Sequence, residues 1–179
     1  MRKRTQASVI TSGTYALSGH DGPYAVERFR CEQTAQEWRY VGVREHPTTG
    51  AALGRIDLLV DLGGRILRLE VSAGDWLLRG GVVGPEAIWR RGGEERSERA
   101  HGFTGTSPAY VVVAARLGPG QRRFVAVHDA ALATSTVDQE WTGAGADWEC
   151  SDLATGDHGR WRLSGGVVTA GPGLTLTTD

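Results

Sequence analysis

Acidic side chains are the first candidates for chemistry in this sequence. Asp57 and Asp61 alternate with apolar residues and would share one face of a β-strand. At about 3.3 Å per residue, their carboxylates would lie ~13 Å apart. The paired carboxyl groups of glycosidases lie roughly 5–9.5 Å apart. We therefore interpret these aspartates as surface residues rather than as an acid and a base that act together.

Histidine and cysteine spacing gives no metal motif. The histidines are His20, His46, His101, His128 and His158. No two of them lie four residues apart, and no Cys-x-x-Cys pair is present for zinc. Cys31 and Cys150 fit reduced thiols better than a disulfide, although the sequence leaves both open. The sequence predicts no cofactor and no metal site.

A nucleophilic site has little support. No Gly-x-Ser-x-Gly elbow occurs, and Ser107, before a proline, is typical of a turn serine. The cluster Gly143-Ala144-Gly145 precedes no predicted helix, so it lacks the helix terminus that would bind phosphate. One hydrolase hypothesis remains, with His101 as the base and Glu27 or Glu37 as its partner.

The tryptophans carry the most functional information. They are Trp38, Trp76, Trp89, Trp141, Trp148 and Trp161. Each ring can bury on the order of 150–250 Å² while it offers one N–H donor. Packing in a sheet core is the ordinary role, whereas lining a cavity for acyl chains or sugar rings is the functional alternative. The candidate ligand-binding residues are Trp38, Trp76, Trp89 and Trp148, with Arg39 or Arg116 for a polar head group.

Alternating runs between glycine-rich turns must position these side chains. The clearest hairpin joins residues 52–62 to residues 65–72 through Gly63-Gly64, because both turn positions can adopt positive φ. Other strands are predicted at residues 24–33, 37–44, 75–83, 87–91, 110–117, 122–128, 136–141, 147–153, 159–163 and 167–170. Residues 92–101 are interpreted as a hairpin end. Residues 130–133 form the only short stretch whose composition suits a helix.

The predicted fold is mainly all-β, because no helix of ten or more residues with an apolar stripe is expected. Sequential hairpins favour a single strongly curved antiparallel meander sheet, a half-barrel or barrel-like shape that protects its edges. The 179 residues suit one domain, residues 1–179. Residues 1–22 are expected to be a loosely ordered N-terminal segment.

Charge and hydropathy exclude several classes of partner. The net charge is −1, and Lys3 is the only lysine among interspersed arginines and acids, so no nucleic-acid footprint is present. No run approaches the ~18 apolar residues of a membrane span. The N-terminus also lacks the apolar core of a signal peptide, so a cytoplasmic location is expected. Oligomerisation is not indicated.

Residues 102–117 resemble a known bacterial motif that reads roughly G-F-T-P-A-T-N-T-L-P-I-R-R-L. Gly102-Phe103-Thr104 opens the match, Thr106-Ser107 replaces Thr-Asn, and Arg116-Leu117 closes it. Gly105 stands where the motif has proline, and two residues are inserted before Arg116. The motif belongs to an uncharacterised bacterial family named for glycolipid binding, whose fold is similar to the periplasmic lipoprotein carriers.

Other segments of the chain share the resemblance. Glu27 followed by residues 37–42 resembles the family's acid and its tryptophan strand ending in glycine. Residues 137–141 resemble its Gln-x-Tyr strand, with Trp141 in place of tyrosine, and residues 148–151 fall where an aromatic strand follows. The resemblance implies a curved antiparallel sheet around a mostly apolar cavity.

Three functions remain open at the sequence level. The first is non-catalytic binding of an amphipathic small molecule, a lipid or glycolipid, in the concavity of the sheet. The second is a protein-interaction or structural β domain with a filled core. The third is a small hydrolase.

Overall fold

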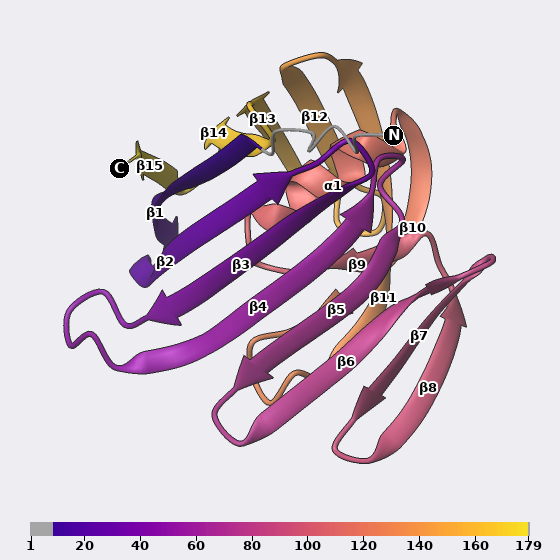
Figure 1. The fold of residues 1–179 in the computed structure, drawn as a ribbon, viewed down its shortest axis with the longest axis horizontal. Helices are drawn as coiled ribbons and strands as arrows, with labels where there is room; N and C mark the ends of the chain where they lie inside the picture. Colours follow the sequence, from indigo (N-terminus) through magenta and orange to yellow (C-terminus); the bar gives the residue numbers. More distant parts are fainter. Residues whose placement is uncertain (1–8, 179) are drawn as a thin grey trace, which may run out of the picture.

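The computed structural model describes residues 9–178 and contains, within that range, fifteen strands and one helix. The first sheet has nine strands in the order β15-β1-β2-β3-β4-β5-β6-β7-β8, all antiparallel (Figure 1). Its strands are β1 Val9–Gly19, β2 Gly22–Gln33, β3 Glu37–Glu45, β4 Ala52–Asp61, β5 Ile66–Ala73, β6 Trp76–Val83, β7 Glu86–Arg91, β8 Glu94–Arg99 and β15 Leu174–Thr178. The C-terminal strand β15 thus pairs with β1 and forms one edge of this sheet.

The second sheet has six strands in the order β14-β13-β12-β11-β10-β9 and curls into a half-barrel. Its strands are β9 Gly102–Thr104, β10 Gly120–Val127, β11 Thr134–Ala144, β12 Asp147–Asp152, β13 His158–Ser164 and β14 Val167–Ala170. Only the pairing of β9 with β10 is parallel among the described strands. The mainly all-β prediction is confirmed, although the strands divide between two hydrogen-bonded sheets rather than forming one.

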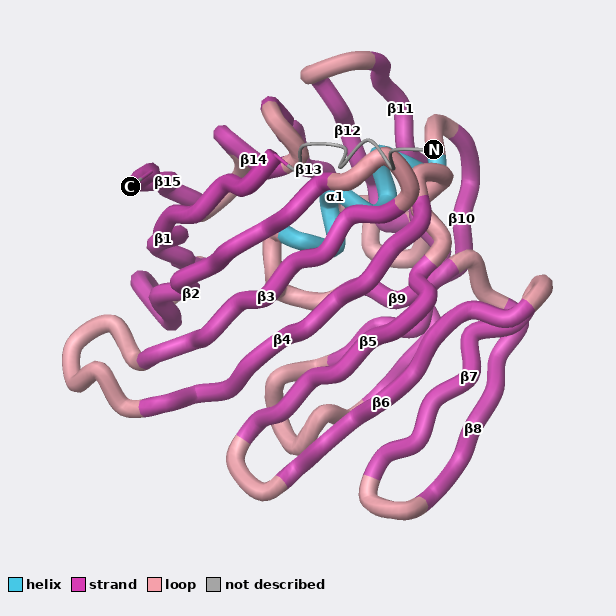
Figure 2. Tube along the Cα trace, in the orientation of Figure 1, coloured by secondary structure: helices cyan, strands magenta, loops and turns pink. Residues whose placement is uncertain are grey.

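Helix α1 spans Ala109–Leu117, where the sequence predicted a strand over residues 110–117. That prediction is wrong. Val111, Val112 and Val113 favour a strand by local propensity, but the burial of this segment in the core outweighs that preference. Pro108 directly precedes the helix, a place that suits the fixed φ of proline. Figure 2 shows this single helix enclosed by strands.

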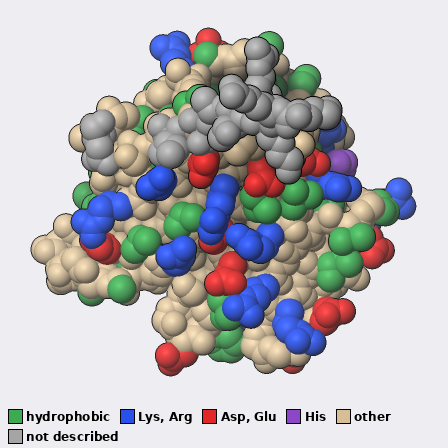
Figure 3. All heavy atoms as spheres, in the orientation of Figure 1, with side chains coloured by type: hydrophobic (Ala, Val, Ile, Leu, Met, Phe, Trp, Pro, Cys, Tyr) green, Lys and Arg blue, Asp and Glu red, His purple; other side chains and the backbone are tan. Residues whose placement is uncertain are grey.

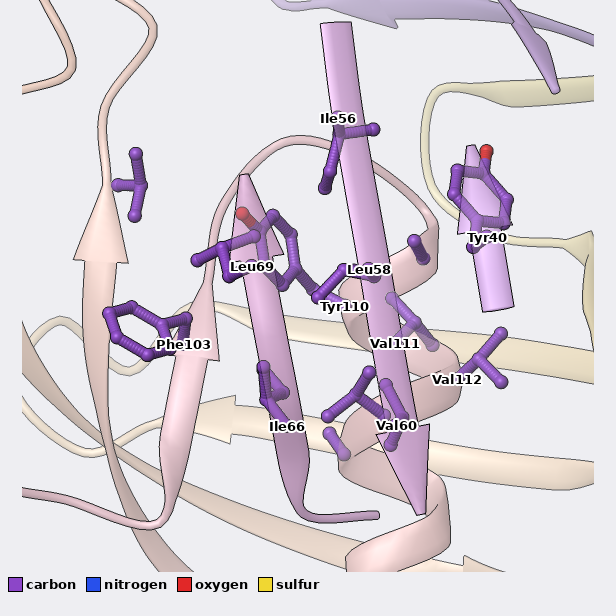
Figure 4. Packing of buried hydrophobic residues seen from close by; sticks show 14 of the residues in the cluster. Tyr40, Ile56, Leu58, Val60, Ile66, Leu69, Phe103, Tyr110, Val111 and Val112 are labelled. Atoms are coloured by element: carbon purple, nitrogen blue, oxygen red, sulfur yellow. The ribbon is translucent and has the colours of Figure 1, made fainter. Parts of the chain in front are cut away.

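The core lies between the two sheets, around α1. Side chains of β4 and β5 point toward the helix, as Figure 4 shows for Leu58, Val60 and Ile66 beside Val111 and Val112. On its other side α1 contacts β14, β11 and β9. The helix therefore fills the middle of the space between the sheets.

Three further predictions can be compared with the structure. The alternation of Trp38, Tyr40 and Gly42 on one face is confirmed, since both aromatic side chains are buried there. Residues 130–133 form a turn rather than a helix. In the segment expected to be loose over residues 1–22, residues 9–19 form β1, and residues 1–8 lie outside the described range.

The face of the nine-stranded sheet turned away from α1 carries a mixture of charges (Figure 3). Arg39 binds Asp57 at 2.8 Å, and Arg79 binds Glu70 at 2.8 Å. Asp61 instead accepts hydrogen bonds from backbone N–H groups of the following turn. The interpretation of Asp57 and Asp61 as separate surface residues is thereby confirmed. No helix in the described part of the chain is long and apolar enough to span a membrane.

Candidate functional site

A fully buried carboxylate lies at the centre of the candidate site. Glu27 on β2 is 0 % exposed and occupies an inward position of its strand, between Ala25 and Phe29. Its Oε1 accepts hydrogen bonds from the hydroxyls of Tyr40 and, at 2.7 Å, Ser107, and its Oε2 accepts one from Arg44 Nε at 2.7 Å. A buried charge is tolerated only when it is paired and hydrogen-bonded, and here three donors meet that requirement.

Strand β3 positions two of these donors. Its register places Arg44 opposite Glu27 and Gly42 opposite Phe29, while the inward alternation brings Tyr40 to the same face. A Cβ atom on Gly42 would lie 2.8 Å from Glu27 Oε1. Glycine is therefore needed at position 42 to leave room for the carboxylate.

Arg44 extends the hydrogen bonds from the core toward solvent. Its Nη1 donates to Thr106 Oγ1 at 2.5 Å and to Asp129 Oδ1 at 3.0 Å, and Thr106 Oγ1 donates to Asp129 at 3.0 Å. The Arg44 side chain is 12 % exposed and that of Asp129 is 56 % exposed. We call these six residues the Glu27 cluster: Glu27, Tyr40, Arg44, Thr106, Ser107 and Asp129.

The environment fixes the protonation of two cluster members. Burial lowers the pKa of the Arg44 guanidinium, but the carboxylates of Glu27 and Asp129 raise it, and the net shift is upward. Burial, together with the charge of Glu27, raises the pKa of Tyr40 well above its ordinary value. Arg44 thus stays cationic, and Tyr40 remains a hydrogen-bond donor at physiological pH.

A cavity of about 280 Å³ adjoins the cluster, and we call it the main cavity. Its apolar wall comes from β2, the first half of β4, the end of β5, the first turn of α1, the end of β10 and the loop after β10. The apolar residues are Ala25, Leu53, Ile56, Val71, Ala73, Tyr110, Val127 and Leu132. Arg44, Thr106, Ser107 and Asp129 form a polar end, beside Tyr24. The main cavity is therefore amphipathic.

The loop between β10 and β11 covers part of the main cavity. It contributes Asp129 and the buried side chain of Leu132. Ala131 and Leu132 have φ values of 53° and 50°, a left-handed conformation that costs roughly 1–2 kcal/mol for each non-glycine residue. Arg91 Nε donates to Ala131 O at 2.9 Å and holds the turn in place. The rest of the fold thus maintains a strained loop against the cavity.

A second, smaller hollow lies across the segment 104–108, and we call it the side cavity. Its volume is about 180 Å³, and it shares Tyr24, Thr106, Ser107 and Tyr110 with the main cavity. Trp141, Trp161, Cys150 and Leu174 are among its remaining wall residues. A Cβ atom on Gly171 would lie 2.1 Å from the Trp161 ring, so glycine allows that ring to pack against the backbone.

Two of the predicted ligand-binding tryptophans lie in the core. Trp38 is fully buried, tilted against Tyr40 with ring centroids 5.6 Å apart. Trp89 packs edge-on against Phe103 at 6.0 Å. Neither residue lines the main cavity or the side cavity.

The other predicted site residues are dispersed. Trp76 is 41 % exposed, and the Arg91 guanidinium lies 4.5 Å from its ring centre. Trp148 donates its Nε1–H to Gly145 O at 3.1 Å and borders an open hollow on the six-stranded sheet. Arg39 pairs with Asp57 on the outer face.

Arg116 and Trp38 are two predicted site residues whose side chains the structure brings together. The Arg116 guanidinium lies 5.4 Å from the ring centre of Trp38, and its Nη2 donates to Gln33 Oε1. Burial lowers the pKa of Arg116. The structure thus brings Arg116 and Trp38 together away from the main cavity, and it places Arg39, Trp76, Trp89 and Trp148 elsewhere.

No sequence pattern predicted Arg44, Thr106 or Asp129 as site residues. Glu27 was expected only through the family resemblance and as a partner for His101, and Ser107 was interpreted as a turn residue. One local signal was available, because Glu27 occupies an inward position among Ala25, Phe29 and Cys31. A charged residue on a buried strand face requires a partner from elsewhere in the chain.

The hydrolase hypothesis depended on His101 meeting Glu27 or Glu37. His101 Nδ1 instead accepts a hydrogen bond from the backbone N–H of Arg123 at 3.2 Å, and the residue borders a different hollow. Glu27 contacts Tyr40, Ser107 and Arg44. Within residues 9–178, no hydrogen bond joins His101 to either glutamate.

The described residues form neither a cluster of metal ligands nor a disulfide. Within the described range, no three His, Cys, Asp or Glu side chains converge closely enough to hold a metal ion. Cys31 and Cys150 are both free, and burial raises the pKa of the Cys150 thiol to about 11. Burial also raises the pKa of the Cys31 thiol, so both thiols are protonated at neutral pH.

The chain was compared with family models, curated proteins and solved structures. No family model matches it, and neither a curated protein nor a solved structure is significantly similar to it.

Proposed function

We propose that this chain binds one small amphipathic molecule without converting it chemically. The proposed ligand is a single-chain lipid or the acyl part of a glycolipid, held in the main cavity. The observation that carries the proposal is the combination of a mostly apolar wall with one polar end formed by the Glu27 cluster. Binding sites for small molecules typically combine apolar walls with a few well-placed polar groups.

The size of the main cavity limits the ligand. Its volume of about 280 Å³ lies near the lower end of ligand pockets, which span roughly 300–1,000 Å³. At ~30 Å³ per water molecule, this space corresponds to about nine waters. A chain of roughly ten non-hydrogen atoms therefore fits, and a longer lipid would extend into solvent or into the side cavity.

The apolar wall supplies most of the expected affinity. Each methylene transferred from water contributes ~0.8 kcal/mol, so an eight-carbon chain contributes about 6 kcal/mol. Lost translational and rotational freedom reduces that value. A dissociation constant of tens of micromolar or weaker is expected for such a chain.

A protein-interaction domain is the second candidate, and the position of α1 favours it. The helix fills the middle of the space between the sheets, and the main cavity and the side cavity both lie beside its first turn. A domain with this architecture can act through its surface alone. If the protein binds a lipid, filling the main cavity should weaken that binding. If it binds another protein through its surface, filling the cavity should leave the binding unchanged.

The first test compares the wild type with a variant whose cavity is filled. Ala73 lines the cavity at the end of β5, so Ala73→Leu adds apolar volume directly into the site. Ala154 is exposed in the turn after β12, and Ala154→Leu is the matched control. Native mass spectrometry of each purified protein, followed by organic extraction, measures the bound lipid.

Lipid that copurifies with the wild type and Ala154→Leu, but is lost in Ala73→Leu, supports binding in the main cavity. Added 1-octanol should likewise bind about tenfold more weakly to Ala73→Leu, because overpacking removes space for the chain. Equal binding by all three proteins would overturn the assignment to this cavity. No binding by any of them would favour the protein-interaction candidate.

A further inference from the structure

We infer that Asp129 selects the head group of the bound molecule, favouring hydroxyl or amine heads that donate hydrogen bonds and rejecting carboxylates and phosphates. This inference rests on the proposed function, because it concerns the polar end of the main cavity. It identifies the ligand as an amphipathic alcohol or amine rather than a fatty acid.

The charges at the polar end carry the inference. Arg44 is the only cation of the Glu27 cluster, and it binds both Glu27 and Asp129, with N–O distances of 2.7 and 3.0 Å. One guanidinium therefore faces two carboxylates. The cluster therefore has a net negative charge, and the one Arg44 nitrogen without a hydrogen-bond partner, Nη2, is buried rather than open to a ligand.

Arg55 also borders the cavity, but its side chain lies on the opposite face of the sheet. Strand β4 alternates, so Ile56 points toward the core while Arg55 and Asp57 point away from it. There Arg55 lies 3.7 Å from Asp57, which Arg39 and Arg68 also contact. These arginines therefore do not offset the negative charge inside the cavity.

Asp129 is the exposed cluster member with hydrogen-bonding capacity to spare, whereas the unpartnered Nη2 of Arg44 is buried. Glu27 accepts hydrogen bonds from three donors and is fully buried. Among residues 9–178, Asp129 receives side-chain hydrogen bonds from Arg44 and Thr106, and more than half of its side chain is exposed. An ionised carboxylate has about four acceptor sites, so Asp129 can accept further N–H or O–H groups from a ligand.

Tyr24 offers a second polar contact on the same wall. Burial raises its pKa, so its hydroxyl stays protonated beside Asp129. Tyr24 borders both the main cavity and the side cavity. A hydroxyl or amine head can thus donate to Asp129 and also meet Tyr24, whereas an anionic head would face the like charge of Asp129.

The test uses three probes that share an eight-carbon chain: 1-octanol, octylamine and octanoate. Calorimetric titration at pH 7 compares the wild type with Asp129→Asn, which removes the charge but keeps the shape. Asp138→Asn is the control, because Asp138 is another half-exposed aspartate paired with arginine, Arg123, and does not border either cavity.

The wild type should bind octylamine and 1-octanol at least about tenfold more tightly than octanoate, because one like charge at close range has an effect of that order. Asp129→Asn should bind octanoate about tenfold more tightly and octylamine about tenfold more weakly, with 1-octanol changed less than ~3-fold. Asp138→Asn should leave all three affinities as in the wild type.

Two results would overturn the inference, and they have different meanings. Tightest binding of octanoate by the wild type, or the same order of probes in wild type and Asp129→Asn, would show that Asp129 does not select the head group. The main cavity would then remain a binding site. No binding of any probe to the wild type would instead overturn the proposed function itself.

Discussion

The hairpin of β2 and β3 buries one arginine near each of its ends, and the two surroundings differ. Near the start of β2, Arg44 lies between the carboxylates of Glu27 and Asp129 beside a cavity. Near the turn, Arg116 from α1 meets the neutral amide of Gln33 and the ring of Trp38. The pKa of Arg44 is raised by its partners, whereas burial lowers that of Arg116.

This difference separates a charged site from a packed one. Arg44 and Glu27 depend on each other, because either charge, left buried without the other, would lower the stability of the fold. The Arg116 guanidinium lies over the Trp38 ring and makes a hydrogen bond to a neutral group, so no buried charge depends on it. The sequence analysis chose Arg116 and Trp38 as site residues, but the cavity lies at the end marked by Arg44.

The largest expected effect follows from removing the cation at the charged end. Arg44→Met keeps much of the side-chain volume but leaves Glu27 buried without its counter-ion. The free energy of unfolding should fall by about 3–5 kcal/mol. Urea denaturation monitored by tryptophan fluorescence measures this loss.

The double variant Arg44→Met/Glu27→Gln is the control for charge. It leaves no buried charge at this end, so it should recover part of the lost stability, because the penalty comes from the unpaired carboxylate. A double variant no more stable than Arg44→Met would contradict the ion-pair explanation. It would indicate that Arg44 acts mainly through the packing of its stem.

Local sequence patterns could predict the strands, but not which charged residues lie together in the folded chain. The alternation in residues 52–62 and 65–72, with Gly63-Gly64 between them, specifies a hairpin from neighbouring residues alone. Val111–Val113 resembles a strand by the same local criterion, yet the sheets around it bury a helix there. Propensity and alternation describe short-range structure, so they fail where distant segments decide the outcome.

The candidate site shows the same limit more clearly. Glu27, Arg44 and Asp129 come from β2, β3 and the loop after β10, and no spacing in the sequence relates them. Sheet register brings Arg44 opposite Glu27, and the position of the β10–β11 loop adds Asp129. In the sequence, the inward position of Glu27 on β2 is a signal that a charged partner is needed, but it does not identify Arg44 or Asp129.

An intermediate effect is expected from the hydroxyl of Tyr40. Tyr40→Phe removes one of the three donors to Glu27 and leaves the ring in place. The free energy of unfolding should fall by about 1–3 kcal/mol at pH 7, because a buried acceptor loses a partner. Denaturant titration checks this value, and Tyr24→Phe, at a half-exposed position, should change stability by less than ~0.5 kcal/mol.

The pH dependence gives a second signature of Tyr40. Its pKa is raised in the folded protein, so above about pH 10 the unfolded chain releases a proton that the folded protein still holds. Raising the pH through that range therefore destabilises the wild type. Tyr40→Phe should show a shallower loss between about pH 9 and 11. Identical slopes for the two proteins would place the alkaline sensitivity in other buried groups.

The smallest effect is expected at the packed end, where Arg116→Met is the direct counterpart of Arg44→Met. Methionine retains apolar contact with Trp38 and removes a charge whose burial is unfavourable, at the cost of the hydrogen bond to Gln33. These contributions oppose each other, so the free energy of unfolding should change by less than ~1 kcal/mol. The affinity for 1-octanol should also remain unchanged, because neither Arg116 nor Trp38 borders the main cavity. A loss of stability as large as that of Arg44→Met would mean that both ends of the hairpin depend on their arginine charge, whereas a loss of octanol binding would move the binding site toward the turn.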